Sequence, residues 1–188
     1  LQVRPVRGRH VLGRGGVCPP AGIEDVGGHT LAAMQAASVA DLPLFATLMA
    51  DFERRWQHDG LVMDNWFRLQ ASRPVAQTLQ QVESLLQHPS FSLHNPNRVR
   101  ALIGTFAAAN PVVFHARNGS GYRFLRTQLE QLNRINPQVA ARIIVPMIQF
   151  GRLDSERKAL IRNELQALAQ LPDLARDLYE KISRALAQ

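Results

Sequence analysis

Arginine is the residue type whose abundance and clustering in this chain indicate a chemical function. Residues 95–152 hold eight of the 22 basic residues and one of the 15 acidic residues, Glu130. This segment therefore carries +7, the formal charge of the whole 188-residue chain, since the other residues balance at fourteen basic and fourteen acidic. A planar guanidinium suits carboxylate or phosphate recognition. The cluster predicts a surface for one of these anions, and the simpler alternative is a solvated basic face.

Two polar residues in this segment lie four positions apart. Gln138 and Arg142 follow Asn136-Pro137, a typical helix start, and their spacing places both side chains on one helix face. Arg100 lies in a similar way beside an apolar stripe. These residues could line a polar cavity rimmed by core residues, or they could be simple surface residues, and spacing alone favours neither alternative.

The histidine, serine and carboxylate residues form no recognised catalytic motif. None of the six histidines is followed by glutamate and no two lie four apart, so the zinc helix H-E-x-x-H is absent. Ser120 stands in NGSGY, which lacks the G-x-S-x-G spacing of a nucleophile elbow. The carboxylates are dispersed, with no evident acid and base pair. We expect no metal site, no cofactor and no catalytic residue in this chain.

Nucleic-acid binding is a further way to use clustered arginine, because arginine neutralises phosphate. However, no helix-turn-helix or zinc finger is visible, and the aromatic residues are not interleaved with the arginines as a stacking surface requires. We expect that nucleic acid is not the partner. No apolar run reaches the roughly 18 to 20 residues of a membrane helix and no signal peptide is seen, which predicts a cytoplasmic protein with no membrane partner.

Helices must position these residues, because Leu, Ala and Gln are frequent and β-branched runs are scarce. Helices of roughly 10 to 17 residues with short connections predict antiparallel neighbours stacked pairwise. We therefore predict an all-α fold, an α-solenoid-like array of the ARM or HEAT kind. The apolar stripes that support it are Val75, Leu79, Val82 and Leu86; Val99, Leu102, Ile103 and Phe106; Tyr122, Leu125, Leu129 and Leu132; Ile161, Leu165 and Leu168; and Leu174, Leu178, Ile182 and Leu186.

Proline and asparagine predict where several helices begin. An Asn cap satisfies free backbone N–H groups, and proline loses nothing at the first helical position. Pro146 lies inside the segment 137–150, where it should kink or shorten a helix. The three Asn-Pro starts are Asn95-Pro96, Asn110-Pro111 and Asn136-Pro137.

Residues 1–29 differ from the rest of the chain. They hold seven of the twelve glycines, three prolines and four arginines, with no helical spacing of apolar residues. We predict an irregular Gly/Arg-rich head over 1–29 and a helical-repeat domain over 30–188.

Five long stretches resemble the C-terminal helical domain of the bacterial aminopeptidase N family, zinc metallopeptidases of the gluzincin clan. The resemblance covers about residues 30–188 with order and spacing preserved. The stretches are DNWFRLQA (64–71), HPSFSLHNPNRVRALIG (88–104), GSGYRFL (119–125), NRINPQVAARI (133–143) and DLYEKISRALA (177–187).

That resemblance implies a domain that caps the active site of an upstream catalytic domain and lines the substrate channel. Zinc and the chemistry would belong to that catalytic domain, so this chain alone would not be an enzyme. Its partners would be the catalytic domain and peptide substrates. Arg100, Gln138 and Arg142 would face the channel. The alternatives are a stand-alone helical-repeat adaptor that binds proteins or peptides and, less favoured, a basic nucleic-acid-binding domain.

Overall fold

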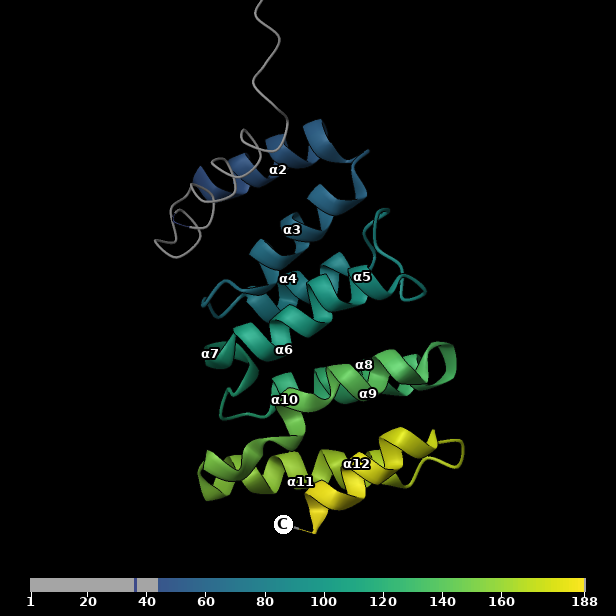
Figure 1. The fold of residues 1–188 in the computed structure, drawn as a ribbon. Helices are drawn as coiled ribbons and strands as arrows, with labels where there is room; N and C mark the ends of the chain where they lie inside the picture. The colour runs from purple at the N-terminus through teal and green to yellow at the C-terminus, as the bar shows by residue number, and fades with distance from the viewer. Residues whose placement is uncertain (1–35, 37–43, 188) are drawn as a thin grey trace, which may run out of the picture.

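The computed structural model describes residue 36 and residues 44–187, and every regular element in this part of the chain is a helix (Figure 1). The all-α prediction is confirmed, whereas the predicted head lies outside the described residues. The helices are α2 (Leu44–Trp56), α3 (Gly60–Ala71), α4 (Thr78–Leu85), α5 (Pro96–Val99), η1 (Arg100–Gly104), α6 (Thr105–Ala109), α7 (Pro111–Phe114), α8 (Ser120–Ile135), α9 (Pro137–Ile143), α10 (Val145–Ile148), η2 (Phe150–Arg152), α11 (Ser155–Ala169) and α12 (Arg176–Leu186).

The helices stack in two layers between α2 at one end and α11 with α12 at the other (Figure 1). In the first layer α3 contacts the continuous helix α5–η1–α6, which contacts α9, which contacts α12. In the second layer α4, α7, α8 and α11 follow one another in contact. Successive long helices alternate between the layers, so the chain builds a solenoid-like array.

All three Asn-Pro pairs begin helices as predicted. Each asparagine oxygen accepts a backbone N–H from the second or third residue of the helix that follows. The prediction for Pro146 is also confirmed, because α9 ends at Ile143 and α10 begins at Val145 with the proline in its first turn. Among the described residues no helix has the length and apolar character needed to cross a membrane.

The core lies between the two layers. The predicted stripes on α5–η1–α6, α8 and α11 are buried throughout. Three of the stripe residues lie outside the helices, since Val75 precedes α4, Leu86 follows it as its C-cap and Leu174 precedes α12. Backbone hydrogen bonds of turns occupy these stretches instead, from Thr78 N to Val75 O and from Leu174 N to Leu171 O.

A buried ion pair holds α3 against α5. The Arg98 guanidinium donates to the Asp64 carboxylate, to the Gly60 carbonyl at 2.7 Å and to the Ser90 carbonyl at 2.9 Å. The Arg98 and Asp64 side chains are only 10% and 6% exposed. This contact fixes the position of the helix that carries Arg100.

Candidate functional site

The three residues chosen from the sequence lie on helices of the first layer. Arg100 is on η1, Gln138 and Arg142 are on α9, and all three are exposed. The two helices touch at Gly104, where an added Cβ would lie 2.9 Å from Cδ1 of Ile143. A glycine here therefore permits the close approach that brings the two arginine-bearing helices together.

Helix α3 adds two residues that sequence analysis missed. Arg68 Nη1 donates to Asn65 Oδ1 at 2.6 Å, and Arg100 Nη2 donates to Asn97 Oδ1 at the same distance. Each pair is an amide followed three residues later by an arginine. We call the exposed side of α3, η1 with α5, and α9 the basic face, defined by Asn65, Arg68, Asn97, Arg100, Gln138 and Arg142.

The basic face exposes cations without exposed carboxylates. Helices α3, α5–η1–α6 and α9 contain a single acidic residue, Asp64, which is buried against Arg98. All three arginines of the face are exposed, and the Arg142 side chain makes no hydrogen bond or ion pair with the described residues. The face can therefore attract an anion, with no neighbouring carboxylate on these helices to compete.

The π-helical turn η1 places Arg100 next to the contact between the helices. Arg100 begins η1 and Gly104 ends it, and Cβ of Arg100 lies 3.9 Å from a Cβ added at Gly104. Thr105 Oγ1 donates to the Arg100 carbonyl at 3.3 Å. Single π-helical turns occur frequently at functional sites, which adds a structural reason to consider Arg100.

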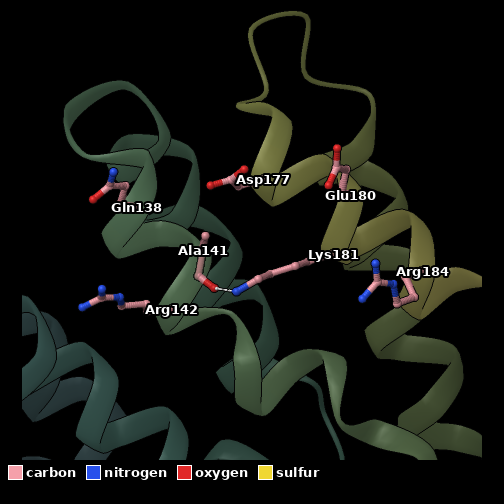
Figure 2. Close-up of a pocket in the computed structure, with 7 residues that line it drawn as sticks. All are labelled: Gln138, Ala141, Arg142, Asp177, Glu180, Lys181 and Arg184. Carbon is pink, nitrogen blue, oxygen red and sulfur yellow. Dashed lines mark hydrogen bonds between the residues drawn. The ribbon is translucent and has the colours of Figure 1, made fainter.

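A groove of about 440 Å³ separates α9 from α12 (Figure 2). Lys181 reaches across it to donate to the Ala141 carbonyl, while Gln138 and Arg142 point away from α12 (Figure 2). Arg100 does not line this groove, so the structure brings together two of the three predicted residues here. The lining residues are Gln138, Ala141, Arg142, Asp177, Glu180, Lys181 and Arg184.

A separate polar cluster joins helices of the second layer. His115 Nδ1 and the Tyr122 hydroxyl are 2.9 Å apart, and Arg157 Nε donates to the His115 carbonyl at 2.6 Å. Burial lowers the pKa of His115, with the nearby Arg157 charge acting in the same direction, and burial raises the pKa of Tyr122 to about 12. These contacts tie the end of α7 to α8 through Tyr122 and to α11 through Arg157, in the layer opposite the basic face.

The histidines of the described region make structural contacts or remain exposed. His88 Nε2 is 2.8 Å from Glu53 Oε1, and its ring packs against Trp66 and Phe67. Over residues 44–187 no three His, Cys, Asp or Glu side chains converge as a metal site requires.

Comparison with known proteins defines the class to which these stacked helices belong. Residues 28–187 match the family described as "Domain of unknown function (DUF3458_C) ARM repeats". The chain is a member of this family of ARM-repeat domains, which agrees with the predicted solenoid-like array.

Its similarity to bacterial aminopeptidases is more specific. The chain is 52% identical over 157 residues to aminopeptidase N of Haemophilus influenzae and of Escherichia coli, which covers 84% of this chain and 18% of each relative. Aminopeptidase N of Caulobacter vibrioides is 38% identical over 138 residues, 73% of this chain and 16% of that protein. These matches confirm the resemblance noted in the sequence, and the chain spans less than a fifth of the length of each relative.

A solved structure shows the same arrangement of helices. The crystal structure of Legionella pneumophila aminopeptidase A in complex with aspartic acid matches with a TM-score of 0.78 and 26% identity. The match covers 84% of this chain and 18% of the Legionella chain. The helical array is therefore similar to one part of a much longer aminopeptidase.

Proposed function

We propose that this chain is a helical accessory domain of a zinc-dependent aminopeptidase that removes N-terminal amino acids from peptides. The observation that carries the proposal is the 52% identity, over 84% of this chain, to two aminopeptidases N. The domain acts with the catalytic portion of the same enzyme in the cytoplasm, and it is not catalytic alone.

The basic face forms this domain's part of the substrate channel. In the proposed enzyme, the domain caps the active site and Arg100, Gln138 and Arg142 line the channel. A peptide whose N-terminus is held at the catalytic centre extends its carboxylate away from that centre. Exposed guanidinium groups attract the carboxylate, and an enclosed channel with few water molecules strengthens the attraction.

Zinc belongs to the catalytic portion of the proposed enzyme. The described residues of this chain have no group of ligands that would hold it. When bound in the catalytic portion, zinc supplies Lewis acidity for peptide hydrolysis. The residues of this chain act on the substrate by attraction and positioning.

The test is a kinetic comparison of the full enzyme with its Arg100→Gln and Arg142→Gln variants. Each substitution removes a cation without removing a buried group, so we expect KM for short peptides to rise by about two- to fivefold per arginine while kcat changes little. C-terminally amidated peptides, which lack the carboxylate, should show a smaller change. Release of amino acids from peptides and from aminoacyl anilides measures both parameters.

Two controls make this experiment decisive. Arg134→Gln removes an exposed arginine from α8 in the second layer and should leave KM unchanged. The purified chain alone should release no amino acid. Unaltered KM in both basic-face variants would contradict the channel role, and peptidase activity of the isolated chain would contradict the accessory role.

A further inference from the structure

The basic face repeats one arrangement on three successive helices of the first layer. An amide side chain lies one turn before an arginine on α3, on α5 with η1, and on α9. We propose that this repeat binds an extended, acidic peptide segment whose carboxylates recur at every third residue. One arginine would bind each carboxylate.

The hydrogen-bonding groups of the face favour a ligand that supplies acceptors. The amide oxygens of Asn65 and Asn97 already accept from Arg68 and Arg100. The groups left for a ligand on these two pairs are the amide N–H donors and the remaining guanidinium N–H donors. Carboxylates and main-chain carbonyls provide matching acceptors, and a charged carboxylate makes the stronger bond.

The spacing of the helices sets the spacing of the carboxylates. Adjacent packed helices lie about 8 to 10 Å apart, and these helices do touch, through Arg98 and Asp64 between α5 and α3 and through Gly104 and Ile143 between η1 and α9. A polyproline II chain rises about 3.1 Å per residue with three residues per turn. Every third side chain therefore lies on the same side of the peptide, at intervals of about 9 Å that match the helices.

The basic face, which has arginines and no exposed carboxylate, ends at α12. That helix presents Asp177 and Glu180 beside Lys181 and Arg184 at the groove shared with α9. Arg176 Nε also bonds Glu180 at 2.8 Å, so opposite charges are mixed on this helix. The basic face thus provides three sites for carboxylates, one each on α3, η1 and α9.

The acidic peptide is a substrate of the enzyme only if the proposed function holds, and in that respect alone the inference rests on it. Binding itself requires the basic face of this chain and can be measured without any catalytic portion. Loss of the proposed aminopeptidase role would leave the binding intact. Absence of peptide binding would contradict this inference but not the proposed capping role of the domain, so the two failures are distinguishable.

The experiment is fluorescence anisotropy with the purified 188-residue chain and two labelled peptides at low salt, where screening is weak. One peptide has three glutamates at every third position in a proline-rich background. The other has the same composition with its three glutamates adjacent. We expect the spaced peptide to bind about tenfold tighter, because the adjacent carboxylates cannot reach three separate arginines.

Single variants locate the binding site. Arg68→Gln, Arg100→Gln and Arg142→Gln should each weaken binding of the spaced peptide by about two- to fivefold, the range for one exposed ion pair. Arg134→Gln removes the same charge from the second layer and should change the affinity less than twofold. Arg68 is the sharpest of these positions, since it was not among the channel residues chosen from the sequence and does not line the groove between α9 and α12.

Three results would overturn the proposal. Equal affinity for the two peptides would show that only net charge is recognised. An effect of Arg134→Gln as large as that of Arg142→Gln would place the attraction over the whole surface. A thymidine oligonucleotide of equal charge that competes better than the spaced peptide would assign the face to phosphate.

Discussion

Arg98 offers the most direct test of how the basic face is held in place. Its guanidinium is buried between α3 and α5, where it pairs with Asp64 and donates to the carbonyls of Gly60 and Ser90. Replacement by methionine preserves much of the apolar volume but leaves the Asp64 carboxylate buried without a cation. Removing one partner of a buried ion pair costs about 3 to 5 kcal/mol.

That cost converts into a large change in melting temperature. A domain of this size loses about 2 to 4 °C for each kcal/mol, so Arg98→Met should lower Tm by about 6 to 20 °C. Asp64→Leu should also destabilise the chain, since Arg98 is then buried without its carboxylate. The double variant should recover much of the loss, because an apolar pair replaces both charges at once. Urea unfolding followed by circular dichroism measures each free energy of unfolding.

The control uses the same chemical change on the surface. Arg54 pairs with Asp51 on α2 with its side chain 75% exposed, so Arg54→Met should cost no more than about 1 kcal/mol. The reasoning is refuted if Arg98→Met costs as little as Arg54→Met. It is also refuted if the double variant loses the full sum of the two single losses, because the two buried charges would then be uncoupled.

Two further predictions concern the second layer. An alanine Cβ at Gly121 would lie 2.3 Å from the Phe114 carbonyl oxygen, a backbone atom, so Gly121→Ala should cost at least about 1 to 3 kcal/mol by thermal unfolding. Gly151→Ala meets nothing within 4 Å and should change stability by less than about 0.5 kcal/mol, and equal losses would contradict the contact. His115 has its folded-state pKa lowered below the ordinary 6.5, so the unfolded chain binds a proton more readily and the free energy of unfolding should fall as pH drops below about 6.5. His115→Gln should flatten this dependence in urea titrations between about pH 5 and 8, and an unchanged slope would exclude His115 as its source.

Local interactions made much of the fold predictable from the sequence. Helix starts at the Asn-Pro pairs depend on a side chain and the backbone two or three residues away, so the signal lies within a few positions. The buried stripes depend on helical periodicity, which is equally local. Turn residues were less predictable, because Val75 and Leu174 continue an apolar spacing although the chain there is not helical.

One of the capping asparagines, Asn110, also has a role that only the tertiary structure reveals. Asn110 caps α7 as its sequence context predicts, and its amide Nδ2 donates to the carbonyls of Ala71 and Arg73 at 3.0 and 2.6 Å. These partners precede it by more than 30 residues, a separation at which no periodicity or motif carries information. The tertiary contact ties the end of α3 to the start of α7.

The arginine cluster shows most clearly what the sequence determines and what only the tertiary structure determines. Composition established an excess of positive charge, and the four-residue spacing of Gln138 and Arg142 placed them on one helix face. Only packing decided the use of each cation: Arg98 is buried against Asp64, and Arg126 pairs with Glu130 and Glu164. Charge can be counted along a chain, but the pairs with Asp64 and Glu164 join residues 34 and 38 positions apart, which the sequence does not reveal. The stacking of α3, η1 and α9 therefore determines which arginines form an exposed face.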